Sequence, residues 1–184
     1  MARDTLSRSL HDLGLAAWFG GTLANAVALN PAAGEAGSSS RSGAVANAGW
    51  DRWTPVNAAA IGAHLVGSVL QLAGNKGRVA GQQGVASMAV VKTGLTAAAL
   101  GVTAYSRVLG SRVSSLHAVP AEDGTTPSGS TPPEVASAQR QLSALQWAVP
   151  AITGALVVVS AYAGEQQRET EVKTGVVKRL LPVG

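Results

Sequence analysis

Cysteine is absent from the 184 residues of this chain, and charged and aromatic residues are scarce. Without cysteine the chain forms no disulfide, no thiolate metal site and no cysteine nucleophile, which removes several classes of enzyme. Charged residues make up 13% of the sequence and hydrophobic residues 46%, whereas an ordinary soluble domain carries roughly 25% charged residues. The apolar surface therefore needs a cover other than one small core, and a lipid bilayer provides it.

The shortage of aromatic residues, at 4% of the chain, leaves Ala, Val, Leu and Gly to supply the hydrophobicity. Small side chains of this kind let helix backbones approach closely within a membrane. Four apolar stretches each come near the ~20 residues that a helix needs to cross the hydrocarbon core. The sequence therefore predicts an all-α fold, a four-helix transmembrane bundle, with spans at residues 10–29, 56–73, 85–108 and 142–163.

The segments that join these spans are polar. Residues 30–54 and 110–133 are rich in Ser, Gly, Pro and Thr, a composition typical of flexible external loops. Trp53-Thr54-Pro55 predicts the N-terminus of the second helix. Thr131-Pro132-Pro133-Glu134 has the form of a capping box and predicts the start of one long fourth helix. The residues after Gly164 form a short cytoplasmic tail, which is either a basic amphipathic helix on anionic lipid or a solvated segment.

The distribution of Lys and Arg predicts the orientation. With four spans, eight of these residues flank the side that holds both termini and five flank the other side. Positive residues favour the cytoplasm, so we expect a multi-pass protein of the inner (plasma) membrane with cytoplasmic N and C termini. An alternative is a cleaved signal peptide, because Arg3 and Arg8 precede the first stretch and Ala26-Val27-Ala28 ends it. Cleavage would leave three spans.

Rows of small residues predict where the helices touch. Such rows usually hold a bundle together, and they can also serve a homo-oligomer or a larger membrane complex. Asn25, in the first span, is expected to add a hydrogen bond between helices. The lipid bilayer is the other predicted partner. The predicted packing residues are Gly20, Gly21, Ala63, Gly67 and Gly101.

Ionisable residues within the spans are the main candidates for chemistry. Lys92 and His64 lie about 10 and 13 Å from the cytoplasmic boundary at ~1.5 Å per residue, so they can be neighbours across a helical hairpin. His11 and Asp12 open the first span. A charge at this depth costs several kcal/mol unless it is paired or hydrated. Either these residues form a functional site, or Lys92 snorkels and pairs with Asp12 while a neutral His64 binds a backbone carbonyl.

Metal or haem binding is a sharper form of the site hypothesis, with His11, His64 and Met88 as candidate ligands. They are single residues on three helices and include no His pair at i, i+4, so we predict neither a bound metal nor a cofactor. The sequence has no phosphate-binding loop, no paired carboxylates within the spans and no Ser-His-Asp set, so no enzyme activity is predicted. The basic residues flank the spans as topology requires, and we predict no binding of nucleic acid.

Three stretches resemble small four-helix integral membrane proteins of high-GC Gram-positive (actinobacterial) bacteria, a likeness that implies no activity. They are residues 11–21, 53–64 and 138–150. More distantly, the first stretch is similar to the opening of copper-resistance D-type and transmembrane-protein-205-like four-helix families, through His11, Trp18, Gly20 and Gly21. The rest of a copper motif is missing, so the resemblance does not carry a copper role to this chain.

Two functions from different classes remain open. One is an accessory or structural membrane protein that packs through its small-residue faces with itself or with a larger complex. The other is a small transport or metal/haem-binding bundle that uses His64 and Lys92 beside a metal, haem or proton path.

Overall fold

The computed structural model describes residues 4–77, 84–115 and 119–165, which are almost entirely helical. The first helix continues through a π-helical turn, Asn25–Leu29, and the short helix α2 ends in a 3-10 turn, Gly34–Ala36. No strand occurs within the described ranges, apart from one isolated bridge between Ala121 and Pro127. The α-helices are α1 (Thr5–Ala24), α2 (Asn30–Ala33), α3 (Ser39–Gly74), α5 (Val85–Ser114) and α6 (Pro133–Glu165).

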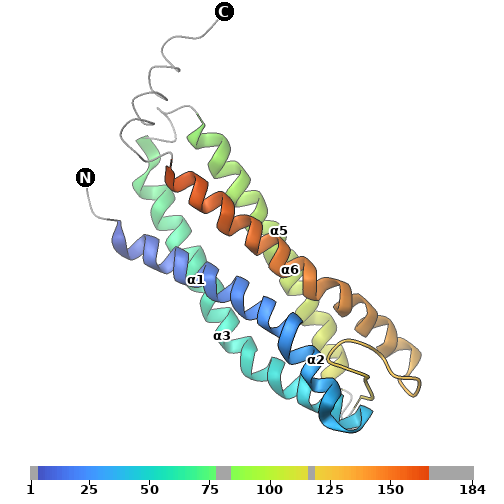
Figure 1. Cartoon of the computed structure of the whole chain (residues 1–184). Coiled ribbons are helices and arrows are strands. Elements are labelled where there is room, and N and C mark those ends of the chain that lie inside the picture. Colours follow the sequence, from blue (N-terminus) through green and yellow to red (C-terminus); the bar gives the residue numbers. More distant parts are fainter. Residues whose placement is uncertain (1–3, 78–83, 116–118, 166–184) are drawn as a thin grey trace, which may run out of the picture.

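Four long helices lie side by side in an elongated bundle (Figure 1). Helix α1 packs along α3, α5 packs along α6, and α1 also contacts α6. By contrast, α3 and α5 make few close approaches. Two cavities lie between them, one beside Lys92 and one beside Arg107. We call this side of the bundle the α3–α5 gap, and the two spaces the Lys92 cavity and the Arg107 cavity.

The predicted flexible loop at residues 30–54 is wrong, because most of it is helix. Helix α3 begins at Ser39, where the side chain of Ser38 accepts a hydrogen bond from the backbone N–H of Arg41. Pro55, expected at a helix start, therefore lies inside α3. Ser42 and Gly43 belong to the predicted loop, yet both are buried. They are small because another part of the chain approaches α3 closely at this point.

The second predicted loop is shorter than expected, because α5 continues to Ser114. The start of α6 at Pro133 agrees with the prediction, although the hydroxyl of Thr131 donates to the carbonyl of Pro120 instead of capping the helix. Residues 119–132 fold over the end of the bundle, and Val119 is 4% exposed. A carboxylate oxygen of Asp123 holds this turn by accepting two backbone hydrogen bonds.

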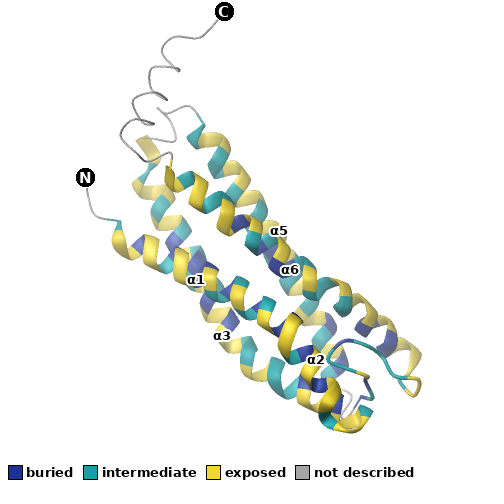
Figure 2. Ribbon diagram, in the orientation of Figure 1, coloured by how far each residue is buried: buried dark blue, intermediate teal, exposed yellow. Residues whose placement is uncertain are grey.

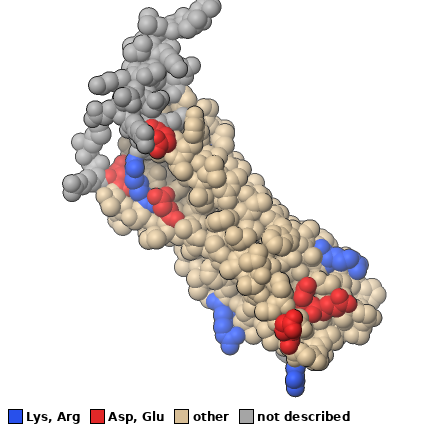
Figure 3. All heavy atoms as spheres, in the orientation of Figure 1, with Lys and Arg blue, Asp and Glu red and all other residues tan. Residues whose placement is uncertain are grey.

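Three of the described helices, α3, α5 and α6, are long and apolar enough to cross a membrane. Helix α1 is not among them, because polar residues such as His11 and Asp12 interrupt its apolar run. On the face drawn in Figure 3, the charged side chains gather at the two ends of the bundle and leave a broad uncharged belt between them. These features are compatible with a membrane protein. The described residues end at Glu165, and the predicted C-terminal tail lies outside them.

Buried residues follow the inward sides of the helices, and the outward sides are largely exposed apolar surface (Figure 2). Of the predicted packing residues, Gly67 touches the α1 backbone, and Gly21 faces the ring of Trp53. Ala63 is half-buried in α3. A side chain added at Gly20 or Gly101 would meet open space, so neither glycine brings two described helices together.

Candidate functional site

Two histidines from different helices meet in the centre of the α1–α3 contact. His11 on α1 is 1% exposed and His64 on α3 is 0% exposed. Their ring centroids are 4.5 Å apart, and the rings are tilted by 48°. Two glycines permit this approach: a Cβ atom on Gly14 would lie 2.5 Å from the backbone N of His64, and one on Gly67 would lie 2.3 Å from the backbone N of His11. Both distances are too short for any other residue, so the pair depends on these glycines.

The hydrogen bonds of the pair define its tautomers. His64 Nδ1 lies 3.3 Å from the carbonyl oxygen of His11, and because a carbonyl only accepts, Nδ1 carries the proton. In a neutral ring, His64 Nε2 is then left to accept from the hydroxyl of Thr96, 3.5 Å away on α5. His11 Nδ1 lies 2.7 Å from a carboxylate oxygen of Asp12 and donates to it. His11 Nε2 is buried and has no partner among the described residues.

Lys92 lies near this pair but forms no ion pair with Asp12, the partner that one of the two sequence-based alternatives assigned to it. It lines the Lys92 cavity, a space of about 420 Å³ that also contains Met88 and Thr96 on its walls. Lys92 acts electrostatically on both histidines and on Asp12. Within the described part of the chain, however, the only ion pair joins Asp12 to the neighbouring His11 ring. Thr96 lines the Lys92 cavity and also bonds to His64, so it lies between the imidazole of His64 and this cavity.

Trp18 extends the buried cluster toward the other end of the bundle. Its side chain is completely buried, and its ring lies edge-on to His64 with centroids 6.2 Å apart. The indole N–H donates to the hydroxyl of Thr103 on α5 over 3.3 Å. Thr96 and Thr103 are seven residues apart, a spacing that places both on the same side of α5. This repeat of hydroxyl residues is the sequence signal for the polar face of α5, which we did not predict.

The expected role of Asn25 belongs to a different residue. Asn25 donates to the carbonyl of Gly21 in its own helix, so no bond between helices results. Asn30 is 1% exposed and connects three elements. Its side chain donates to Gln146 on α6 over 2.8 Å and accepts from the indole of Trp50 on α3 over 3.1 Å. The sequence placed Asn30 at the start of a loop, which hid this role.

Carboxylate and imidazole groups, which bind and release protons, make up the centre of this cluster. Among the described residues, no group of three His, Asp or Glu side chains is arranged to hold a metal ion. The two imidazoles lie directly against each other, which leaves no room for a haem between His11 and His64. Carboxylate, imidazole and hydroxyl groups do follow one another from Asp12 through both rings to Thr96.

Comparison with known proteins gave no relative: no family model, curated protein or solved structure matches the chain.

Proposed function

We propose that this chain is a small multi-pass protein of the plasma membrane that moves protons through a polar centre built around His64 and Lys92. The buried pair of neighbouring histidines is the observation that carries the proposal. Two imidazoles from different helices lie 4.5 Å apart, and His11 Nε2 has no partner in the described structure. Buried polar atoms are nearly always hydrogen-bonded, and an unpartnered one calls for a functional explanation.

The proposed route begins at the exposed carboxylate of Asp12, passes the Lys92 cavity in the cytoplasmic half of the bundle, and continues along α5 past Thr103 toward the other end. A proton would be exchanged between Asp12 and Nδ1 of His11, and between Nε2 of His64 and the hydroxyl of Thr96. The two rings are tilted and share no hydrogen bond, so transfer between them would require one imidazole to turn and bring a free nitrogen to the other. Histidine suits such a step because its two ring nitrogens can each donate or accept a proton. The positive charge of Lys92 would oppose the entry of a second proton into the histidine pair.

In this proposal all four long helices cross the membrane, with both termini in the cytoplasm. The uncharged belt in Figure 3 and the length of α3, α5 and α6 support the placement. Helix α1 would be retained and not cleaved as a signal peptide, because its His11 and Trp18 are core residues. The resemblance to actinobacterial four-helix membrane proteins is part of the same proposal.

Cysteine labelling would test the topology, since the chain has no cysteine of its own to remove. All four of the chosen residues are exposed. Ser40 belongs to the start of α3 and Ser130 precedes α6, whereas Lys76 follows the end of α3 and Glu165 ends α6; these two pairs of helix ends lie at opposite ends of the bundle (Figure 1). With a membrane-impermeant maleimide on intact cells, we expect Ser40→Cys and Ser130→Cys to react. Lys76→Cys and Glu165→Cys should react only after permeabilisation. Labelling of all four positions in intact cells would contradict a membrane-crossing bundle.

Proton movement can be measured with the full chain in liposomes that carry an imposed potassium diffusion potential and an internal pH dye. His64→Gln keeps a donor for the carbonyl of His11 but cannot pass a proton, so flux should fall by about a hundredfold, the low end of the contribution of a positioned acid or base. Lys92→Met should also lose flux, although it should fold as well as the parent because it removes a charge from the membrane. Lys76→Met is the matched control and should conduct normally. Equal flux in the parent and in His64→Gln would refute the proposal.

An interaction role is the second candidate, favoured by the outer surface of α5. In the apolar stretch of α5 that is long enough to cross a membrane, 6% of the residues are buried inside the protein. The corresponding share is 22% in α3 and in α6. Gly94 and Gly101 on this helix face open space, as expected where another helix could approach. We predict that Ala98→Cys, exposed on the same helix, forms a disulfide-linked dimer in membranes and that Gly101→Leu reduces it. Ala161→Cys, exposed on α6, is the control position. Equal cross-linking at both positions would indicate random collision.

A further inference from the structure

The Arg107 cavity contains hydrogen-bonding groups that the protein itself does not use. It has a volume of about 310 Å³ and lies at the other end of the α3–α5 gap from Lys92. Asn57 is 9% exposed and its Oδ1 atom has no partner among the described residues. The same holds for the indole N–H of Trp53, one helical turn away on α3. Both side chains line the cavity, and their unpartnered atoms are themselves buried, so a bound group would reach these atoms only where the side chains turn toward the cavity.

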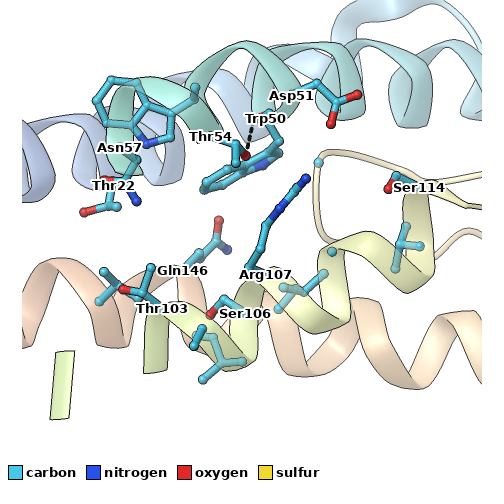
Figure 4. Close-up of a pocket in the computed structure, with 18 of the residues that line it drawn as sticks. Thr22, Trp50, Asp51, Thr54, Asn57, Thr103, Ser106, Arg107, Ser114 and Gln146 are labelled. Atoms are coloured by element: carbon cyan, nitrogen blue, oxygen red, sulfur yellow. Dashed lines mark hydrogen bonds between the residues drawn. The ribbon is translucent and has the colours of Figure 1, made fainter. Parts of the chain in front are cut away.

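Arg107 adds an unpaired positive charge to the same space. Its side chain extends from α5 across the cavity toward α3 (Figure 4). Asp51 also lines the cavity, yet no ion pair joins it to Arg107 within the described chain. A guanidinium and an indole N–H only donate hydrogen bonds, whereas Asn57 Oδ1 only accepts. The complementary head group therefore carries an anion and a hydroxyl.

Apolar side chains also line the cavity and favour a hydrocarbon chain. They include Ile61, Leu142, Leu145 and Val149, beside further polar residues such as Thr103 and Gln146. Leu100 lines both this space and the Lys92 cavity, so the apolar surface continues along the α3–α5 gap. A chain attached to the head group would lie along this surface and reach the surrounding bilayer where α3 and α5 are separated.

We propose that the Arg107 cavity binds an anionic membrane lipid whose head group carries a phosphate and a hydroxyl, as phosphatidylglycerol does. The phosphate would accept hydrogen bonds from Arg107 and Trp53, and the hydroxyl would donate to Asn57. The inference rests on the membrane placement proposed above but not on proton movement. Lys92→Met should therefore lose flux and still bind the lipid.

The test is native mass spectrometry of the full chain, delipidated in a non-ionic detergent and titrated with dioleoyl phosphatidylglycerol. We expect one saturable lipid per chain, and at least tenfold weaker binding of dioleoyl phosphatidylcholine. Arg107→Gln should weaken phosphatidylglycerol binding by about tenfold or more, because it removes a charge-assisted hydrogen bond. Arg112→Gln is the matched control, since Arg112 is exposed on the same helix and does not line the cavity.

Three results would overturn the inference. Equal binding of the two phospholipids would mean that the cavity does not recognise the head group. Unchanged binding in both Arg107→Gln and Trp53→Phe would place the lipid elsewhere, and Trp53→Phe removes only the N–H donor. Displacement of the lipid by glycerol 3-phosphate at equal concentration would identify a soluble phosphate compound as the ligand instead of a lipid.

Discussion

Gly67→Ala should destabilise the protein by about 1–3 kcal/mol, although it adds a single methyl group. The added Cβ atom would lie 2.3 Å from the backbone N of His11 and 2.6 Å from the carbonyl oxygen of Ser7. Backbone atoms cannot rotate away as a side chain could, so α1 and α3 have to separate. Separation would also pull His11 away from His64. The measurement is the unfolding midpoint in mixed micelles of maltoside and dodecyl sulfate.

Gly62→Ala is the matched control on the same helix. A Cβ atom there would meet nothing within 4 Å, and alanine is normally favoured over glycine inside a helix by roughly 0.5–1 kcal/mol. The two substitutions are therefore expected to change stability in opposite directions. If Gly67→Ala is as stable as Gly62→Ala, then α1 and α3 are not in backbone contact, and the histidine pair described here does not form.

The sequence predicted the helical class and the position of several helices, because long apolar stretches and a proline-marked start are local signals. The start of α6 at Pro133 is the best example. The start of α3 was missed because residues 39–54 are small and polar. Their composition matches that of a loop, and only the other elements packed against them explain why Ser42 and Gly43 are buried.

For the candidate site, the sequence identified the ionisable residues but not their partners. Depth along the helices indicated that His64 and Lys92 could lie near each other. It gave no reason to bring His11 against His64, since that contact depends on the rotation of α1 about its own axis. The rotation is determined by Gly14 and Gly67, which bring the backbones together only on one pair of faces. Asp12 then bonds to its neighbour His11 and not to Lys92.

The cavities could not be predicted from any local pattern. They exist because α1 pairs with α3 and α5 pairs with α6, while the fourth side of the bundle stays open. Trp50 and Trp53 both line the Arg107 cavity. An aromatic residue near a membrane surface can anchor a helix there or line a cavity, and only the packing of the helices distinguishes these two roles.

Asn30→Ala should be the second strongly destabilising change, with an expected loss of about 2–4 kcal/mol. The substitution removes two side-chain hydrogen bonds and leaves the Oε1 atom of Gln146 and the indole N–H of Trp50 without their partner. Each buried group left unsatisfied costs about 1–3 kcal/mol. These bonds link Asn30, in the helical segment that continues from α1, to α3 and α6. The loss should therefore appear as a lower unfolding midpoint, with unchanged helix content in the folded state.

Asn25→Ala provides the comparison, because Asn25 is buried in the same continuous helical segment but bonds only to Gly21 of its own helix. A single hydrogen bond of this kind contributes about 0.5–1.5 kcal/mol, so this variant should lose less stability than Asn30→Ala. Adding Gln146→Leu should cost less in the Asn30→Ala background than in the parent, since the Oε1 atom left unpaired is then removed. Equal losses for the two asparagine variants, or fully additive losses for Asn30 and Gln146, would mean that the α1 segment is not fastened to α6 through this bond.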